Sequence, residues 1–274
     1  MTLALEGPLL IAGAGKMGTA MLSGLLEAGL EPFQVIIQDP APSLEVQDFV
    51  IREGVRCAPA ITSLEAPPSV ILAAVKPQIM DKVMPGLAQL AGPDTLLLSI
   101  AAGRTIASFE QHLPTGTAVI RAMPNTPAAV GAGITVCCAN AHVSESQKLI
   151  AEEMLRAVGD VAWIEDEALM DSVTAVSGSG PAYVFYLVEA LTDAGIAAGL
   201  DAELSARLAR ATVAGSGRLL EAADDDAATL RKNVTSPGGT TAAALEVLTA
   251  DDGLKPLMKA AVAAAVKRGR ELAG

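Results

Sequence analysis

Two glycine-containing segments could each bind an anion, and they lie near opposite ends of the chain. The first, GAGKMG at residues 13–18, follows an apolar run and precedes a helical pattern. The second, TSPGGTT at residues 235–241, precedes an alanine-rich helical run. Backbone N–H groups at the start of a helix have no intrahelical acceptor, so both segments could present donors and partial positive charge to an anion. An ordinary capped helix start is the alternative for the second segment.

The first segment has the glycine spacing of a dinucleotide-binding loop. Gly13 would permit the tight turn, Gly15 would let the backbone approach a pyrophosphate, and Gly18 would allow close packing of helix on strand. A structural turn is the alternative, but the strand before the loop and the helix after it favour cofactor binding. We therefore predict that a dinucleotide pyrophosphate is bound by Gly13, Ala14, Gly15, Lys16, Met17 and Gly18.

The type of nicotinamide cofactor depends on the end of the second strand. Asp39 lies there, about 20 residues beyond the glycine loop, where an acidic residue commonly binds the ribose 2′-hydroxyl of NAD. Residues 34–51 contain no Lys or Arg that could meet a 2′-phosphate. Charge alone favours NADH over NADPH. A plain turn residue before Pro40 is the alternative for Asp39.

Two further loops follow apolar runs that are typical of buried parallel strands. Val75-Lys76-Pro77 follows one run and Ala101-Ala102-Gly103 follows the next. Open α/β sheets bind ligands at the carboxyl ends of their strands, so both loops are expected to line the cofactor site. Lys76 could instead be a solvated surface charge.

Apolar runs and helical patterns alternate over the first part of the chain. A helix is predicted over residues 16–28, and strands are predicted over 8–13, 35–39, 69–75, 95–101, 118–123, 133–139 and 161–165. Continuous apolar runs bounded by Gly, Pro and Lys indicate strands buried on both faces. The pattern predicts a doubly wound α/β domain, here a Rossmann dinucleotide-binding domain over residues 1–164, with helices between its strands.

The strand-like runs end near Glu165, and the remainder is predicted to be a helical domain over residues 165–274. Its predicted helices cover about 167–176, 181–198, 202–222, 226–233, 240–249 and 254–272. Residues 181–191 carry one charge in eleven residues, and a helix that is apolar on all sides must be buried on all sides. A second subunit is the expected cover. A central helix within one bundle is the alternative.

Composition excludes several classes of function. The net charge is −12, which opposes binding to nucleic acid or to an anionic membrane surface, and aromatic residues make up only 3%. Three cysteines and two histidines show no metal-ligand spacing, so no metal is expected, and free thiols indicate a reducing cytoplasm. The first residues lack the basic region of a signal peptide, and no apolar stretch reaches the length of a membrane span. We expect a cytoplasmic protein.

Five motifs occur along the chain in an order that carries a family resemblance: GAGKMG (13–18), AVKP (74–77), MPNTP (123–127), AVSGSGPAY (175–183) and SPGGTT (236–241). Together they resemble the pyrroline-5-carboxylate reductase family over essentially the whole chain. The resemblance implies reduction of the cyclic imine 1-pyrroline-5-carboxylate to L-proline with NADPH or NADH, the last step of proline biosynthesis. It also implies a Rossmann domain followed by a helical domain that interlocks with that of a partner, as a homodimer or a larger assembly.

The resemblance implies roles for individual residues. Beyond the glycine loop, the cofactor would contact Ala74, Val75, Lys76, Pro77, Ala102, Asn125 and Asn233. Asn125 would lie near the nicotinamide, and Asn233 would come from the helical domain of the partner subunit. The substrate would contact Glu167, Ser236, Gly239, Thr240 and Thr241. Glu167 would lie close to the ring nitrogen.

The chemistry of the substrate assigns a task to the second glycine segment. The start of the helix near Gly239 can donate backbone N–H groups to the substrate carboxylate, and Ser236 can add a hydroxyl donor. Thr241 can hydrogen-bond the ring nitrogen and is the predicted catalytic residue. Hydride attack is easier on a protonated imine, which can arrive protonated, so catalysis is expected to act mainly by positioning.

One region departs from the family pattern, and two other functions are alternatives. Members that prefer NADPH tend to place small hydroxyl or basic residues after the second strand, where this chain has Asp39-Pro40. A related hydroxy-acid dehydrogenase would place a lysine on the interdomain helix, but residues 166–206 contain none. A non-catalytic dimer that senses a dinucleotide would not need the SPGGTT segment.

Overall fold

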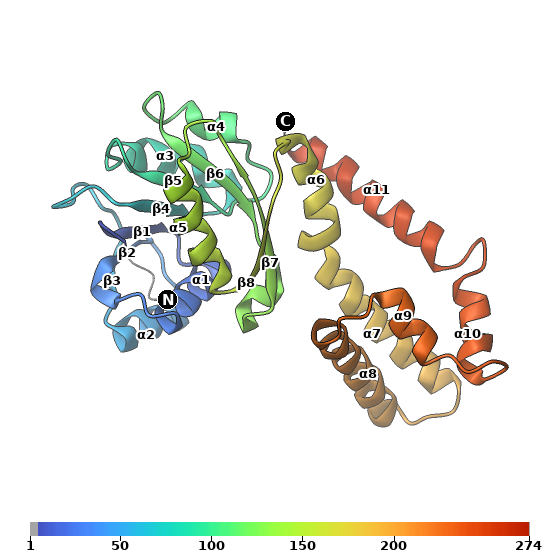
Figure 1. The fold of residues 1–274 in the computed structure, drawn as a ribbon. Coiled ribbons are helices and arrows are strands. Elements are labelled where there is room, and N and C mark those ends of the chain that lie inside the picture. Colours follow the sequence, from blue (N-terminus) through green and yellow to red (C-terminus); the bar gives the residue numbers. More distant parts are fainter. Residues whose placement is uncertain (1–4, 274) are drawn as a thin grey trace. The chain divides into compact units, whose positions relative to one another are not determined.

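Short apolar runs form the parallel strands of the protein, which a computed structural model describes for residues 5–273 (Figure 1). Strand β1 (Leu9–Ala12) lies between β2 (Val35–Gln38) and β4 (Val70–Ala73), and Leu9 is opposite both Val35 and Val70. All four residues of β1 are buried. A strand that is apolar at every position fits this place, because helices cover both faces of a parallel sheet.

The described residues form one eight-stranded sheet in the order β3-β2-β1-β4-β5-β6-β7-β8. The remaining strands are β3 (Arg56–Ala58), β5 (Leu96–Ser99), β6 (Ala118–Met123), β7 (Gly133–Ala139) and β8 (Gly159–Trp163). Pairing is parallel from β3 through to β6, antiparallel between β6 and β7, and parallel between β7 and β8. The order of the first six strands is that of a doubly wound dinucleotide-binding sheet, which confirms the predicted fold class.

The sheet differs from the sequence prediction in three details. No α-helix separates β6 from β7, because the connection holds only the 3₁₀ helix η3 (Thr126–Val130) and is too short for a parallel crossover. Strand β3 was not predicted, since its three residues include an exposed arginine and form no apolar run. Strands β4, β5 and β8 each end two residues before their predicted ends at residues 75, 101 and 165, and β8 begins two residues before its predicted start at residue 161.

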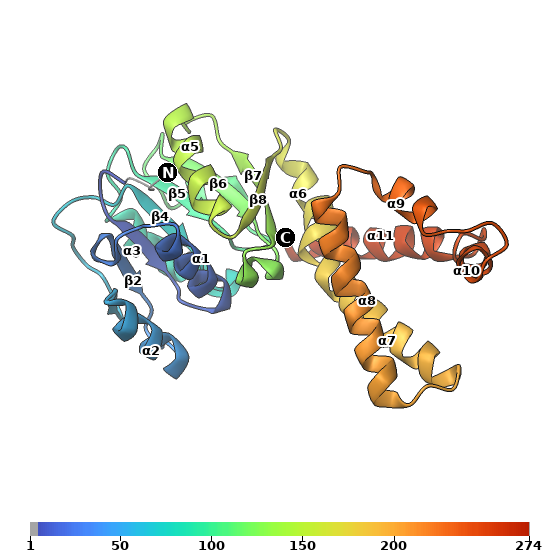
Figure 2. The same cartoon turned by 60° about the horizontal axis from the view of Figure 1, so that its bottom comes forward.

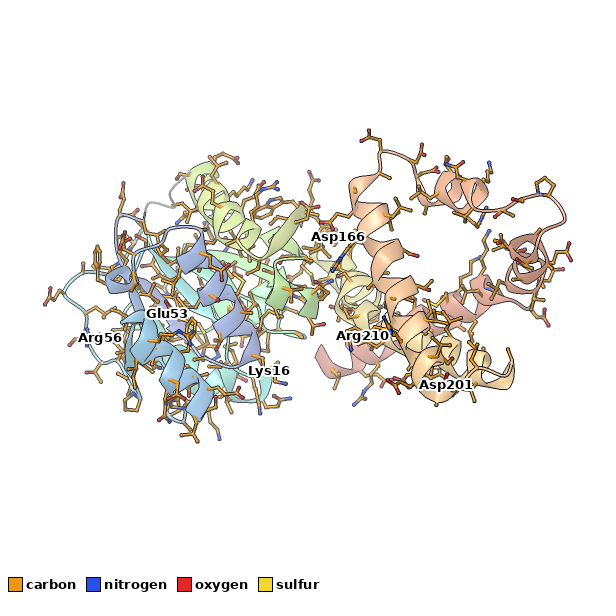
Figure 3. The ribbon with its side chains drawn as sticks, turned by 90° about the horizontal axis from the view of Figure 1, so that it is seen from below. Lys16, Glu53, Arg56, Asp166, Asp201 and Arg210 are labelled. Carbon is orange, nitrogen blue, oxygen red and sulfur yellow. The ribbon has the colours of Figure 1, made fainter. Side chains whose placement is uncertain are left out.

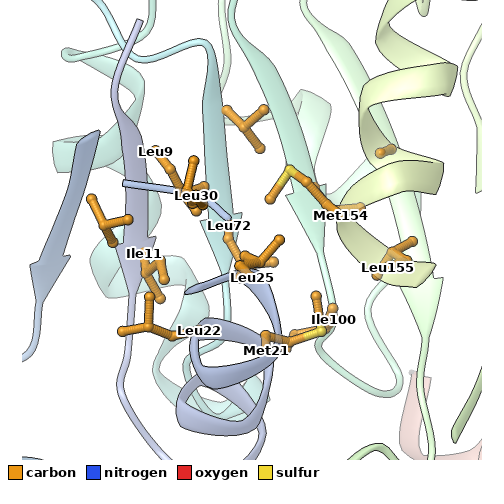
Figure 4. Packing of buried hydrophobic residues seen from close by; sticks show 14 of the residues in the cluster. Leu9, Ile11, Met21, Leu22, Leu25, Leu30, Leu72, Ile100, Met154 and Leu155 are labelled. Atoms are coloured by element: carbon orange, nitrogen blue, oxygen red, sulfur yellow. The ribbon is translucent and has the colours of Figure 1, made fainter. Parts of the chain in front are cut away.

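Helices cover both faces of the sheet. On one face lie α1 (Lys16–Glu27), α2 (Leu44–Glu53) and α5 (Glu145–Arg156), and on the other lie α3 (Met80–Ala88) and α4 (Ile106–Glu110). Figure 4 shows Met21, Leu22 and Leu25 of α1 packed with Leu9 and Ile11 of β1. Alternate residues of each strand therefore enter different cores, as the period of two along a strand requires.

The second half of the chain is helical, as predicted. Its helices are α6 (Met170–Val173), α7 (Gly180–Ala197), α8 (Ala202–Ala222), α9 (Ala227–Asn233), α10 (Thr240–Leu248) and α11 (Leu254–Ala273). Residues 167–176 do not form the single α-helix that was predicted. A 3₁₀ turn η4 (Glu167–Leu169) leads into α6, and a π-helical turn η5 (Thr174–Gly178) follows it.

Internal packing divides the chain into two compact units. The smaller unit is Ser179–Ala265, and the larger unit runs to Gly178 and takes in the chain from Val266 on. In the smaller unit α7 and α8 lie side by side (Figures 1 and 2), and the Ser205 hydroxyl donates to the Thr192 carbonyl over 2.7 Å. Between residues 5 and 273 no helix has the length and apolarity to cross a membrane.

The outer surface of α7 is apolar. In the single chain the exposed fraction is 62% for Phe185, 69% for Tyr186 and 51% for Leu187. Contiguous apolar side chains on this scale mark an interaction surface. The smaller unit therefore does not bury α7 on all sides, contrary to the alternative in which α7 is the central helix of one bundle.

The burial of the cysteines gives a first testable prediction. The neighbouring residues Cys137 and Cys138 are both buried. Burial, with smaller contributions from the Glu152 charge and from Cys138, raises the pKa of Cys137 to about 12. Cys57 is partly exposed. We expect iodoacetamide at pH 8 to modify Cys57 in the native protein and to modify Cys137 and Cys138 only after unfolding. Mass spectrometry of digested samples measures this.

The same shift predicts the sign of a pH effect on stability. The Cys137 pKa is raised on folding, so its contribution to the free energy of unfolding is complete below about pH 9 and falls as the pH rises toward 12. Replacing this thiol in Cys137→Ala should flatten that alkaline decline. Modification of native Cys137 as fast as in urea would contradict the buried position.

Candidate functional site

The loop between β1 and α1 has a shape that only glycine allows at two positions. Gly13 has a φ of +93°, and a Cβ there would lie 2.9 Å from Cγ1 of Val75. A Cβ on Gly18 would lie 2.4 Å from the carbonyl oxygen of Gly13. Both glycines are thus required by the fold itself. They let α1 begin directly against the end of β1.

Gly15 differs from these two glycines, because a Cβ there would meet no protein atom within 4 Å. It is the N-cap residue of α1, and no side chain caps the helix. The N-terminus of α1 is therefore open on the side of Gly15. Lys16, labelled in Figure 3, is the first residue of the helix and is exposed. The space fits a pyrophosphate lying against backbone N–H groups, with Lys16 beside it.

Asp39 holds the glycine loop in place. One carboxylate oxygen accepts a hydrogen bond of 2.8 Å from the N–H of Ala14, and the other accepts one of 2.9 Å from the N–H of Ala41. This contact with the loop was not predicted from the sequence. Two ionised carboxylate oxygens offer about four acceptor positions, so capacity is left for a ribose hydroxyl. The assignment of that hydroxyl to Asp39 stays a prediction.

The predicted β4 and β5 loops follow strands that run parallel with β1, with β4 next to β1 and β5 next to β4. The N–H of Ala74 donates to the carbonyl of Ala12 over 2.8 Å, which joins the β4 loop to the end of β1. Lys76 is exposed, and Pro77 begins the 3₁₀ helix η2 (Pro77–Ile79). Ala102, after β5, is also exposed. Parallel strands end at one edge of a sheet, so these loops share that edge with the glycine loop.

Asn125 lies in the connection that leaves β6. It is the residue before η3, and its side-chain oxygen accepts a hydrogen bond of 3.0 Å from the N–H of Ile134 at the start of β7. Two residues earlier in the chain, Met123 packs closely against the π-helical turn, because a Cβ on Gly178 would lie 2.6 Å from the Met123 methyl group. The position of Asn125 is thus fixed by the reversal between β6 and β7.

A buried ion pair between Arg121 and Glu167 was missed by the sequence analysis. Arg121 lies in β6 with 6% of its surface exposed, and its Nη1 is 2.8 Å from Oε1 of Glu167. The same oxygen accepts a hydrogen bond of 2.9 Å from the N–H of Ile106, the first residue of α4. The signal in the sequence was a single cation within the apolar run AVIRAM. Glu167 thus has a structural contact, and its predicted place near the substrate nitrogen stays a prediction.

A second group of charges joins α3 to the loop after β5. Both terminal nitrogens of Arg104 bind the carboxylate of Asp81, and Nε2 of His112 lies 3.1 Å from Oδ1 of Asp81. Hydrogen bonds hold the pKa of Asp81 below its ordinary value; those from Arg104 contribute most, and the one from His112 contributes next. Asp81 is therefore ionised at neutral pH.

In the smaller unit, α10 begins without a side-chain cap. Gly239 is the N-cap residue with extended backbone, and its N–H donates to the carbonyl of Ser236 over 3.0 Å. Gly238 has a φ of +69° and completes the turn. Thr241, the second residue of the helix, is partly buried. The first turn of α10 thus presents backbone donors beside two hydroxyl side chains.

The predicted site residues are divided between the two units. The larger unit holds the residues predicted for the cofactor with one exception, and it also holds Glu167. The exception is Asn233, the last residue of α9, whose side-chain nitrogen is 3.4 Å from Oδ2 of Asp225. The smaller unit holds this residue together with Ser236, Gly239, Thr240 and Thr241.

A cavity of about 670 Å³ lies at the opposite edge of the sheet, where β4, β5 and β6 begin. The buried hydroxyl in its wall belongs to Thr95, which donates to the Pro68 carbonyl and accepts from the Gly92 N–H. Among the described residues, the one buried side-chain nitrogen or oxygen without a partner is Nε of Arg104, which is not in this wall. The loops predicted to bind the cofactor lie instead at the edge where the strands end.

A sheet of this order, with an open glycine loop at the N-terminus of a helix and a carboxylate at the end of β2, defines a dinucleotide-binding protein. Comparison with known proteins agrees. Residues 9–103 match the family model described as NADP oxidoreductase coenzyme F420-dependent. Residues 167–272 match the model described as pyrroline-5-carboxylate reductase dimerisation.

Named relatives align with nearly the whole chain. The pyrroline-5-carboxylate reductase of Pseudomonas aeruginosa is 40% identical over 264 residues, which cover 95% of each protein. That of Mycobacterium leprae is 41% identical over 284 residues, covering 96% of this chain and 95% of the relative. The chain therefore belongs to the pyrroline-5-carboxylate reductase family, a family of NAD(P)H-dependent oxidoreductases, as predicted.

Solved structures of the family have the same fold. The pyrroline-5-carboxylate reductase of Coxiella burnetii superposes with a TM-score of 0.89 at 36% identity, covering 97% of this chain and 98% of that one. The Plasmodium falciparum enzyme, solved with NADP bound, has a TM-score of 0.79 at 29% identity, covering 98% and 99%. These relatives do not favour the hydroxy-acid dehydrogenase or the non-catalytic sensor.

Substitutions of Gly15 and Gly18 distinguish an effect on cofactor binding from an effect on folding. Gly15→Ala adds a methyl group into open space, so we expect an unchanged melting temperature but cofactor affinity about tenfold weaker or more, because the methyl group would occupy the place predicted for the pyrophosphate. Gly18→Ala should lower the free energy of unfolding by about 1–3 kcal/mol, since it overpacks the loop.

Gly86→Ala, within α3 and also in open space, is the matched control and should preserve affinity. Titration of NAD(P)H fluorescence and thermal unfolding measure the two effects. Unchanged affinity in Gly15→Ala would contradict a pyrophosphate at this loop.

Proposed function

We propose that this protein reduces 1-pyrroline-5-carboxylate to L-proline with NAD(P)H, the final step of proline biosynthesis. Family membership supports the reaction, and the geometry supports a division of labour between two anion sites. The open N-terminus of α1 takes the pyrophosphate of the cofactor. The open N-terminus of α10 takes the carboxylate of the substrate.

The observation that carries this proposal is the missing cap on α10. A helix start with Ser236, Thr240 and Thr241 nearby has three hydroxyl groups that could cap it, yet no side chain accepts its N–H groups. Such groups are ordinarily satisfied by a cap, by water or by a ligand. A carboxylate fits them in charge and in geometry. A protein that bound only a dinucleotide would not need this second site.

The chain acts on the substrate by holding it in one orientation. We assign the carboxylate to the first-turn N–H groups of α10 with the Ser236 hydroxyl, and the ring nitrogen to the Thr241 hydroxyl. Gly239 and Thr240 shape this turn, and Glu167, whose Oε1 also binds Arg121, is placed close to the ring nitrogen. Bound NAD(P)H supplies the hydride. Orienting the imine carbon toward the nicotinamide is the main contribution of the protein.

The cofactor lies, in this proposal, along the carboxyl edge of the larger unit. Residues 13–18 bind the pyrophosphate with Lys16 as a counter-charge. Ala74, Val75, Lys76, Pro77 and Ala102 line the nicotinamide half, and Asn125 lies beside the ring. Asp39 binds the adenosine ribose and favours NADH over NADPH, because a carboxylate repels a 2′-phosphate.

We further propose that the working enzyme is a homodimer formed through the helical domain, or a larger assembly of such dimers. The match of residues 167–272 to a dimerisation model and the exposed apolar side chains of α7 support this. Asn233 of the partner subunit would then reach the cofactor. We place the domain boundary at residues 164/165, just after β8 ends at Trp163. The free cysteines support a cytoplasmic location.

Thr241→Ala tests the substrate site. The loss of a hydrogen bond to a charged group costs about 1.5–3 kcal/mol, so kcat/KM for 1-pyrroline-5-carboxylate should fall about ten- to hundredfold. Cofactor affinity should be unchanged. Thr249→Ala, at the C-terminal end of the same helix, is the control with full activity. Full activity in Thr241→Ala would remove this residue from the mechanism. Absence of turnover in the unaltered protein with either cofactor would refute the reductase function.

Asp39→Asn tests the cofactor preference. The asparagine oxygen can still accept the Ala14 N–H, so the contact with the glycine loop should be retained while the charge and the acceptor for the Ala41 N–H are removed. We expect the ratio of kcat/KM for NADPH to that for NADH to rise about fivefold or more, the equivalent of about 1 kcal/mol between charges in water. Asp48→Asn on the exposed surface of α2 is the charge-matched control. An unchanged ratio would mean that Asp39 does not read the ribose.

A further inference from the structure

Two loops proposed to line the cofactor are tied together by one ion pair. Asp81 lies in the first turn of α3, shortly after Lys76 and Pro77. Arg104 follows Ala102 and Gly103 in the loop between β5 and α4. The two charged residues are 23 positions apart in the chain, yet both terminal nitrogens of the guanidinium bind both oxygens of the carboxylate. The pair therefore joins the β4 loop to the β5 loop.

The pair is built differently from an ordinary surface ion pair. The Arg104 side chain is only 20% exposed, although that of Asp81 is 58% exposed. His112, after α4, adds a third contact at 3.1 Å to the same carboxylate. A bidentate guanidinium–carboxylate pair fixes orientation as well as distance, whereas a lone exposed pair adds little stability. We therefore expect the geometry of the Arg104–Asp81 pair to fix the positions of the loops more than it stabilises the protein as a whole.

The loop that carries Ala102 needs such a restraint. Gly103 has a φ of +71°, and a Cβ there would meet nothing within 4 Å, so side-chain packing does not fix this turn. Beyond the turn, the N–H of Ile106 is held by Glu167 over 2.9 Å. On the β4 side, the N–H of Ile79 donates to the carbonyl of Lys76 over 3.1 Å, which makes the segment leading to α3 a single tight turn.

We propose that Arg104 and Asp81 are positioning residues that set the spacing between the β4 and β5 loops and thereby the affinity for NAD(P)H. Neither residue contacts the cofactor in this assignment; each acts through the backbone of Lys76, Pro77 and Ala102. The inference rests on the proposed cofactor site. Loops that are already held in the bound arrangement avoid an ordering cost when the cofactor binds, so loss of the tie should weaken its affinity.

Arg104→Met removes the tie while keeping the apolar length of the side chain. We expect the Kd for NAD(P)H, measured by fluorescence titration without any imine, to rise about tenfold, which corresponds to about 1.4 kcal/mol. The KM for the cofactor should rise in parallel while kcat changes less than twofold. Arg104→Lys, which keeps the charge but offers no fork, should recover part of the affinity.

Controls separate this effect from general damage. Arg156→Met removes the same charge from contacts with Glu152 and Asp160, which join α5 to the start of β8 and touch no cofactor loop, and it should leave the Kd unchanged. Asp81→Asn removes the carboxylate charge and keeps the shape of the side chain. It therefore tests the ion pair through the partner of Arg104 if Arg104→Met fails to fold.

The outcomes distinguish this inference from the proposed reaction. A raised Kd in both Arg104→Met and Asp81→Asn supports the tie, even if the unaltered protein fails to turn over the imine and the reaction assignment is lost. Turnover by the unaltered protein with an unchanged Kd in folded Arg104→Met or Asp81→Asn overturns the tie and leaves the reaction in place. Failure of the unaltered protein to bind NAD(P)H overturns both.

Discussion

The parallel register of β1 between β2 and β4 determines where the site of the larger unit can form. Leu9 is opposite both Val35 and Val70, so the three strands end together at the same edge of the sheet. Hydrogen bonds continue this alignment past the strands, from Gly13 N–H to the Gln38 carbonyl and from Ala74 N–H to the Ala12 carbonyl. Because the strands are neighbours in the sheet, the loops that follow them are also neighbours.

That alignment explains why the site of the larger unit consists largely of backbone groups rather than side chains. At Gly13 and Gly18 a side chain would strike neighbouring atoms, and the close approach of α1 to the sheet leaves the helix N-terminus exposed at the edge. The charged side chains that matter most are those that hold loops. Asp39 holds the glycine loop, and Glu167 holds the start of α4 while it neutralises the buried Arg121. Uncapped helix starts then remain as places for anions in both units.

Much of the fold could be predicted because its signals are local. The apolar runs of β1, β4 and β5 and the glycine spacing after β1 depend on neighbours in the chain alone. Strand β3 and the direction of β7 could not be predicted in this way. The short edge strand carries no apolar run, and the reversal after β6 depends on the length and proline content of its connection.

The residues of the site were easier to predict from the sequence than the contacts between them. The glycine loop and Asp39 were identified from spacing, but the hydrogen bond between Asp39 and Ala14 depends on the turn that each adopts. The pairs of Arg121 with Glu167 and of Arg104 with Asp81 join residues 46 and 23 positions apart. Nothing in the local sequence specifies such partners, since they are set by strand order. Family motifs indicated Glu167 but not Arg121.

The most direct test of the account follows one hydrogen atom. NADH and NADPH carrying deuterium at both C4 positions of the nicotinamide would be incubated with the protein and unlabelled 1-pyrroline-5-carboxylate, and the product would be analysed by mass spectrometry and NMR. The account predicts L-proline with one deuterium on the ring carbon that formed the C=N bond. Cofactor oxidation without deuterium at that carbon, or no proline at all, would contradict it.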